Sequence, residues 1–205
     1  MAGFEEGRAH YWERHTRGDG AWRSGSAGPP GEHLAALRRG VGREPGTVPS
    51  MWPFYSTLNE QGQMTSSLRA EHVALTLFAI HQRSQLGPVH RKDVGVGRAV
   101  RTLRDSERFS EEAVDRRFTA AANCESLGEL SVHLRGLVTQ MRSLSSAGLD
   151  YTRLFRDLRD WQLPQRRAAV RRRWGGEYFA GLLERHEGAE SDPSQTGERP
   201  TKESR

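Results

Sequence analysis

The chain has 205 residues, a formal net charge of +5 and a single cysteine, Cys124. This length is enough for one compact domain with its own hydrophobic core, and one cysteine cannot form an internal disulfide, which excludes a disulfide scaffold and fits a reducing compartment. Because no apolar run has transmembrane length and the start shows no signal-peptide pattern, we expect a cytoplasmic protein without a membrane partner.

Arginine dominates the basic residues. Lys92 and Lys202 are the only lysines, so 29 of the 31 basic residues are arginines. Two explanations compete: arginine codons are favoured in GC-rich genomes, and the planar guanidinium is suited to phosphate. Residues 187–205 carry a charge of −2, so residues 1–186 carry +7, which fits an anionic partner.

The pattern of apolar residues predicts an all-α bundle of about eight to nine helices and no sheet. Segments 17–31 and 40–49 are rich in turn-forming residues and are predicted to be loops, and no segment shows clean strand alternation. Helices are expected at 3–16, 31–39, 51–58, 66–82, 95–106, 110–123, from 126 towards Gly148, at 150–161 and from Pro164 to about His186.

Two of these helices have the clearest signals. Residues 66–82 contain VALTLFAI, which is apolar nearly all round and predicts a buried central helix. The helix that starts at Ser126 has a capping box with Glu129 at the third position, followed by apolar residues at spacings of three and four.

We interpret residues 1–186 as a single helical domain. It consists of an N-terminal helical part, about 1–92, and a C-terminal helical bundle, about 93–186. Residues 187–205 are polar and nearly free of apolar side chains, so they are expected to form a disordered tail.

The sequence contains no recognisable catalytic or metal-binding motif. No His-x-x-x-His pair or Cys/His cluster is present, and His72 and His81 are nine residues apart, which predicts two core or surface histidines. Cys124 is interpreted as a small buried residue. We therefore expect neither a metal nor a cofactor, and no enzymatic activity.

Basic residues provide the stronger functional signal. They form stripes on three predicted helices and in one loop, where they could neutralise phosphates and release counterions. Because no base-reading motif is recognisable, binding should be independent of sequence. On this reasoning the candidate nucleic-acid-binding residues are Arg91, Lys92, Arg98, Arg101, Arg135, Arg142, Arg166, Arg167 and Arg171.

The order of several short motifs resembles the CasB family, the small subunit of the type I-E CRISPR interference complex Cascade. The resemblance covers about residues 31–185. Its motifs are Leu37-Arg38-Arg39-Gly40, PSMWPFYSTL at 49–58, Leu77-Phe78-Ala79, Gly97-Arg98-Ala99-Val100, Asp115 to Phe118, His133-Leu134-Arg135-Gly136-Leu137-Val138, and Asp150-Tyr151 leading to Trp161 and an arginine-rich last helix.

The resemblance implies a non-catalytic, all-α subunit present as two copies in Cascade. Its partners would be the CasC backbone subunits, the CasA large subunit, the guide RNA and the target and non-target DNA strands of the R-loop, which it would stabilise. The resemblance adds Arg38 and Arg39 to the candidate residues. That pair has a structural alternative, in which it is buried against carboxylates such as Asp157 or Asp160 and holds two helices together.

Two other functional classes remain open at this stage. The arginines could contact acidic proteins, in which case the chain would be a helical scaffold or regulator. A metal-dependent hydrolase is a third hypothesis, and it predicts stoichiometric bound metal.

Overall fold

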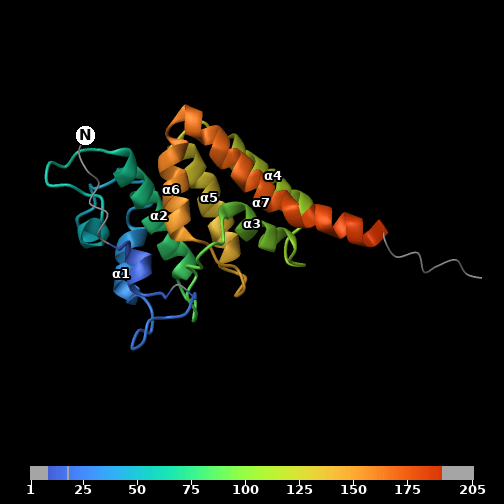
Figure 1. Cartoon of the computed structure of the whole chain (residues 1–205). Helices are drawn as coiled ribbons and strands as arrows, with labels where there is room; N and C mark the ends of the chain where they lie inside the picture. The colour runs from blue at the N-terminus through green and yellow to red at the C-terminus, as the bar shows by residue number, and fades with distance from the viewer. Residues whose placement is uncertain (1–8, 18, 191–205) are drawn as a thin grey trace, which may run out of the picture.

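The computed structural model describes residues 9–17 and 19–190, in which the chain forms seven α-helices and two short 3-10 helices (Figure 1). Two isolated backbone bridges, Thr16 with Trp22 and His90 with Leu149, are the only strand-like pairings of the described residues. The all-α prediction is therefore confirmed. The elements are η1 (Tyr11–Arg14), α1 (Gly31–Arg38), η2 (Pro49–Phe54), α2 (Ser66–Gln82), α3 (Val96–Arg104), α4 (Glu111–Asn123), α5 (Leu127–Met141), α6 (Tyr151–Trp161) and α7 (Pro164–Glu190).

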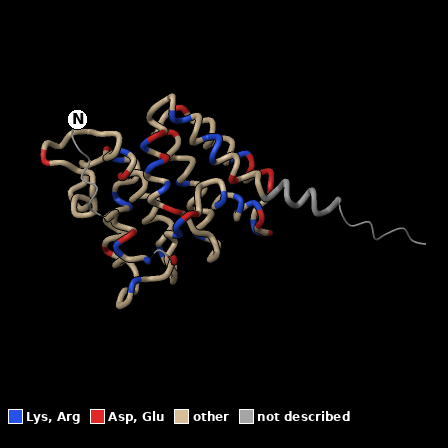
Figure 2. Tube along the Cα trace, in the orientation of Figure 1, with Lys and Arg blue, Asp and Glu red and all other residues tan. Residues whose placement is uncertain are grey.

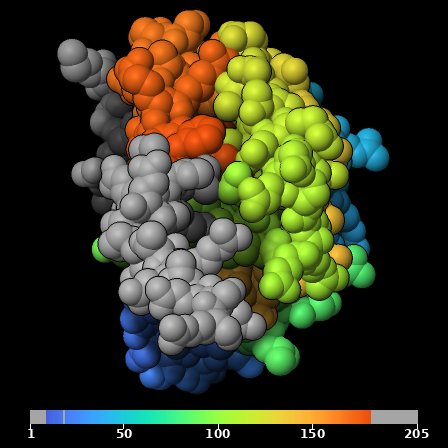
Figure 3. Space-filling view, turned by 90° about the vertical axis from the view of Figure 1, so that its right-hand side faces the viewer, coloured from blue at the N-terminus to red at the C-terminus, as the bar shows by residue number. Residues whose placement is uncertain are grey.

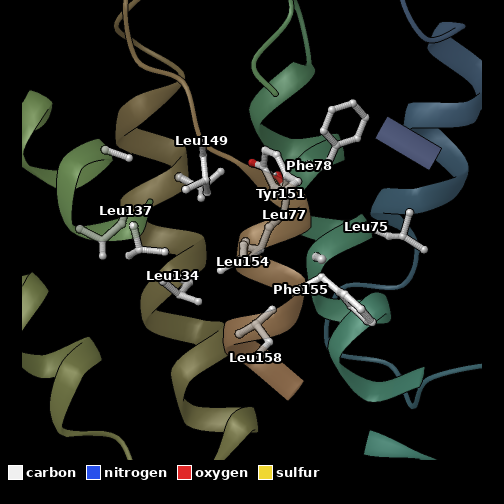
Figure 4. Packing of buried hydrophobic residues seen from close by; sticks show 14 of the residues in the cluster. Leu75, Leu77, Phe78, Leu134, Leu137, Leu149, Tyr151, Leu154, Phe155 and Leu158 are labelled. Atoms are coloured by element: carbon white, nitrogen blue, oxygen red, sulfur yellow. Dashed lines mark hydrogen bonds between the residues drawn. The ribbon is translucent and has the colours of Figure 1, made fainter. Parts of the chain in front are cut away.

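Helix α2 is the centre of the first half of the bundle. It packs against α1, α5 and α6, and most of its residues are buried, as its apolar sequence predicts. Leu77 of α2 lies beside Leu154 of α6, whereas Leu75 points to the other side of α2, away from α5 (Figure 4). These side chains belong to a continuous buried cluster that runs from Tyr11 to Tyr178.

Helices α3 and α7 pack closely in the second half. A Cβ atom at Gly97 of α3 would collide with the carbonyl oxygen of Trp174, so only glycine allows this approach. On the neighbouring face, Phe118 of α4 stacks on Tyr178 of α7 with ring centroids 4.3 Å apart. Figure 3 shows α4 in yellow-green and α7 in orange covering this side of the molecule. No helix in the described part of the chain has both the length and the apolar character needed to cross a membrane.

The N-terminal segment is anchored to α2 by a buried carboxylate. The side chain of Glu71 is fully buried and accepts hydrogen bonds from the backbone and hydroxyl groups of Ser56 and Thr57. His10 Nδ1 lies 3.1 Å from the same carboxylate. Burial raises the pKa of Glu71, but hydrogen bonds from His10, Ser56 and Thr57 outweigh it and leave the pKa below its ordinary value. Glu71 is therefore ionised and joins three chain segments.

The structure differs from the predictions at three elements. The helix expected at 3–16 is only a 3-10 turn at Tyr11–Arg14 within the described residues, because Tyr11 and Trp12 are drawn into the core (residues 3–8 lie outside the described part). The helix expected at 51–58 is the 3-10 segment η2, since Pro53 lacks a donor and disfavours the α conformation in the residue before it. Helix α7 continues to Glu190, and the remainder of the predicted tail, 191–205, lies outside the described residues.

Candidate nucleic-acid interface

Five arginines surround one hollow of about 570 Å³ at the junction of α1, α2, α4 and α5. No acidic residue lines it; Ile80, Val132, Thr139 and Gln140 supply much of the remaining wall. We call this site the arginine pocket. Its arginines are Arg38, Arg83, Arg117, Arg135 and Arg142.

Helix ends position three of these side chains. Arg38 is the last residue of α1, Arg83 is the C-cap of α2, and Arg142 is the C-cap of α5. The C-terminal end of a helix carries roughly half a negative charge, which favours a cation there. Three such ends offset only a minority of five guanidinium charges, so the arginine pocket remains strongly positive.

None of the five arginines forms an ion pair with a carboxylate in the described part of the chain. Burial, followed by the nearby charges of Arg83 and Arg142, lowers the pKa of Arg38. A guanidinium nevertheless stays charged at neutral pH. Like charges are therefore held together without a compensating anion, and an anionic ligand would relieve their repulsion.

A larger groove of about 710 Å³ continues from the arginine pocket. The two depressions share Ile80, Val132 and Arg135. The groove adds Arg43, Arg69 and Arg167 to the basic lining, but it also contains Glu44 and Glu125. Its charge is therefore mixed, and the arginine pocket is the more electropositive end.

The basic stripe of α3 is largely used within the fold. Arg98 is exposed and makes no ion pair with a described carboxylate, whereas Arg101 donates to the carbonyl of Glu177 at 3.2 Å. In the preceding loop, Arg91 donates to the carbonyl of Ser146 at 3.1 Å. Arg91 and Lys92 are both exposed and line a separate hollow of about 670 Å³.

The arginines of α7 make tertiary contacts. Arg166 pairs with Asp160 at 3.1 Å, and Arg167 pairs with Glu125. Arg171 contacts the same Glu125 at 2.9 Å, donates to the carbonyl of Cys124 at 2.9 Å and lies 5.4 Å from the centroid of a Trp161 ring. These residues attach α7 to α6 and to the α4–α5 connection. Nucleic-acid binding by Arg166, Arg167 and Arg171 stays a prediction.

The structural alternative for Arg38 and Arg39 does not occur. Asp157 pairs with Arg173 and accepts a hydrogen bond from Trp174 Nε1 at 2.6 Å. Asp160 pairs with Arg166 instead. Arg38 is in the arginine pocket, and Arg39 is exposed beside it in sequence but does not line it.

Sequence reasoning therefore found three members of the arginine pocket, Arg38, Arg135 and Arg142, and missed Arg83 and Arg117. The sequence does contain a signal for Arg83, since this residue directly follows the strongly apolar helix α2 and therefore lies at the C-terminal end of that helix. Arg117 had none, because its position depends on how α4 packs against α5. The distribution of charged residues alone does not locate the site, because basic and acidic residues are interspersed over the described part of the bundle (Figure 2).

His72 and His81, interpreted from the sequence as core or surface histidines, are both buried and hydrogen-bonded. His72 Nδ1 lies 2.6 Å from the hydroxyl of Tyr55, and His81 Nδ1 lies 3.0 Å from that of Tyr151. Burial lowers the pKa of His81 to about 4, so this ring is neutral at physiological pH.

Cys124 is buried as predicted. Burial, then the nearby Glu129, raises the pKa of its thiol to about 11, so it is not an activated nucleophile in the metal-free chain. The absence of a Cys/His motif in the sequence does not, however, exclude a cluster in space. The fold brings Cys124, Glu129 and His133 together, because the chain turns between α4 and α5.

The fold and the site together define an all-α protein with an acid-free arginine pocket. Residues 33–179 match the family model described as CRISPR-associated protein Cse2. The chain belongs to the Cse2 family, whose solved members are also named CasB.

Individual relatives agree with this assignment. The chain is 26% identical over 175 residues to the CRISPR-associated protein Cse2 of Thermus thermophilus, covering 84% of this chain and 89% of that protein. It is similar to the crystal structure of CasB from Thermobifida fusca, with a TM-score of 0.58, 29% identity, and coverage of 72% of this chain and 84% of that one. For CasB from Thermus thermophilus the TM-score is 0.56, with 25% identity and coverage of 73% and 86%.

Proposed function

We propose that this chain is the non-catalytic small subunit of a type I-E CRISPR Cascade complex, and that it stabilises the R-loop by contacts to sugar-phosphate backbone. Membership of the Cse2 family supports the assignment to CRISPR interference. The observation that carries nucleic-acid binding is the arginine pocket, a hollow that five arginines line without a carboxylate among the lining residues.

Phosphate is the ligand that this chemistry suits. Guanidinium groups form paired hydrogen bonds to phosphate oxygens, and each neutralised phosphate releases condensed counterions. Such contacts do not depend on base identity, so the guide RNA would read the sequence while the protein contributes affinity. Strand exchange in an R-loop is close to balanced, and a modest backbone contribution therefore shifts it towards the open state. The target and non-target DNA strands are the proposed ligands. CasC, CasA and a second copy of this chain are the proposed protein partners.

The test is a salt titration of DNA binding. The purified chain is titrated with fluorescent single- and double-stranded DNA at several salt concentrations, and log K is plotted against log[salt]. Phosphate binding predicts a slope of about −0.7 per contacted phosphate for single strands and about −0.9 for duplex. Arg83→Gln and Arg135→Gln should each reduce the magnitude of the slope by roughly one contact, with no loss of thermal stability.

The control is Arg156→Gln, which removes an exposed charge on α6 outside the arginine pocket. It should leave the slope unchanged. A poly-glutamate competitor covers the rival hypothesis of an acidic protein partner. Should the pocket variants bind DNA like the parent, or should poly-glutamate bind as tightly as DNA of equal charge, backbone recognition by this pocket would be wrong.

A further inference from the structure

A thiol, a carboxylate and an imidazole meet at the connection between α4 and α5. One donor atom each from Cys124, Glu129 and His133 lie within 4.8 Å of one another. In the described part of the chain, no other group of three such side chains converges in this way. The cluster lies outside the arginine pocket, and the proposed function does not use it.

The local structure explains the convergence. Glu129 is in the first turn of α5, and His133 follows four residues later, so their side chains lie on the same face of the helix. Cys124 is the C-cap of α4, and its Sγ donates to the carbonyl of Ala120 at 3.3 Å. Because Cys124 is only 1% exposed, its sulfur is held in place by the core.

The capping arrangement also leaves the carboxylate available. Ser126 caps α5 by accepting a hydrogen bond from the backbone N–H of Glu129 at 3.1 Å. The Glu129 side chain, which a capping box would turn back towards Ser126, lies instead beside Cys124 and His133. Glu129 is exposed and can therefore adjust its position, whereas the cysteine is fixed.

We propose that Cys124, Glu129 and His133 bind one Zn²⁺ ion. Thiolate sulfur, imidazole nitrogen and carboxylate oxygen are the donors that zinc takes in proteins, at about 2.3, 2.0 and 2.0–2.2 Å. Tetrahedral bonds of these lengths place donors roughly 3.5 Å apart. Because the three donor atoms lie within 4.8 Å of one another, each pair needs to close by at most about 1.3 Å. Three protein donors leave the fourth position to water, and on binding the thiol releases its proton to solvent.

Neighbouring charges do not prevent this. Arg171 and Arg167 lie beside the cluster, but both are paired with Glu125. Glu125 lies in the same short connection, and its carboxylate offsets part of the positive charge of these two arginines. A zinc ion here would link the end of α4 to the start of α5, directly below the residues to which α7 is attached. The inference concerns a metal-binding site and is independent of the proposed function.

Direct metal titration tests the proposal. The full chain is purified under reducing conditions, stripped with a chelator and titrated with Zn²⁺ by calorimetry and with Co²⁺ by absorption spectroscopy. We expect one ion per chain, a cobalt–thiolate charge-transfer band in the near ultraviolet and a rise in the thermal midpoint with Zn²⁺. Cys124→Ser, which is nearly isosteric, should abolish the charge-transfer band.

Glu129→Gln and His133→Ala should each weaken Zn²⁺ binding by on the order of tenfold or more, since even the loss of a supporting partner costs about 10- to 100-fold. Glu60→Gln removes an exposed carboxylate elsewhere and serves as the matched control, with no change expected. Circular dichroism of the metal-free variants checks that they are folded, and Glu129→Gln keeps the test valid if Cys124→Ser does not fold. Failure to bind one Zn²⁺ per chain, or binding that survives both Cys124→Ser and Glu129→Gln, would overturn the proposal.

Discussion

Replacing Glu71 with glutamine should destabilise the protein far more than a change of one atom suggests. In the native chain, the fully buried carboxylate of Glu71 acts only as a hydrogen-bond acceptor. Its donors belong to His10, Ser56 and Thr57. A glutamine amide has only one oxygen. In either orientation its NH₂ group faces donors that previously contacted an oxygen.

The magnitude follows from the hydrogen bonds that the substitution removes. If the amide nitrogen replaces Oε2, the backbone N–H of Thr57 (2.8 Å) and its hydroxyl (2.6 Å) no longer have an acceptor. Hydrogen bonds to charged groups contribute about 1.5–3 kcal/mol each. Because the threonine hydroxyl can rotate and accept from the amide, we expect a loss of about 3 kcal/mol. For a domain of this size, this corresponds to a fall in Tm of about 6–12 °C.

The pH dependence provides an internal check. The folded pKa of Glu71 is below its ordinary value of 4.5, so its contribution is fully present above that value and is lost as pH falls through the folded pKa. The difference in unfolding free energy between the parent and Glu71→Gln should be constant from neutral pH to about pH 5 and shrink below 4.5.

Urea denaturation at a series of pH values measures both quantities. Glu60→Gln is the control, because Glu60 is exposed and surface changes typically stay within about 0.5 kcal/mol. If Glu71→Gln lost less than about 1 kcal/mol at neutral pH, or if the difference grew in acid, the carboxylate would not be the charged centre of this network.

Three further predictions concern the scaffold and are checked by thermal and urea denaturation. Gly97→Ala should lower the free energy of unfolding by about 1–3 kcal/mol, because the added methyl group would collide with the Trp174 backbone. Gly176→Ala places its methyl group in open space on α7 and should raise that free energy by up to about 1 kcal/mol. Equal effects of the two substitutions would contradict the close approach of α3 and α7. Arg171→Ala should lower Tm, unlike the pocket variants, because a guanidinium that contacts a carboxylate, a carbonyl and an aromatic ring is removed; an unchanged Tm would show that these contacts contribute nothing. Leu75→Ala should cost about 2–5 kcal/mol, since the side chain is fully buried, and a smaller loss would mean that the core relaxes into the cavity.

The sequence predicted most of the helical scaffold because its signals are local. Ser126 caps α5 by accepting a backbone hydrogen bond, although the Glu129 half of the predicted capping box does not form. Helices α6 and α7 begin where expected, next to Asp150, which caps α6, and at Pro164. Helix α2 is buried almost all round, as its composition indicates. The N-terminal segment could not be predicted in the same way, since Tyr11 and Trp12 leave the helical pattern to reach the core.

The site was predicted only in part, because the sequence does not show which arginines form ion pairs with carboxylates. Arg135 and Arg171 look alike in sequence, yet one lines an acid-free hollow and the other contacts Glu125. That carboxylate is 46 residues before Arg171, and the periodicity of apolar residues within a helix cannot predict so distant a partner. Arg117 and the Cys124 cluster were missed for the same reason, because both depend on how helices meet. Helix formation is encoded locally, whereas the availability of a charge is decided by tertiary contacts.

The match to the family model begins at residue 33, but the folding unit begins earlier. Trp12 is completely buried, packs near Phe78 and Tyr151, and donates to Thr152 at 2.9 Å. The segment around Trp12 covers one side of the hydrophobic core. A shortened protein trimmed to the region of family likeness would leave that side open and lined with aromatic rings, together with an ionised Glu71 that no longer has His10 beside it. Trimming for crystallisation or reconstitution should therefore spare residues 9–17.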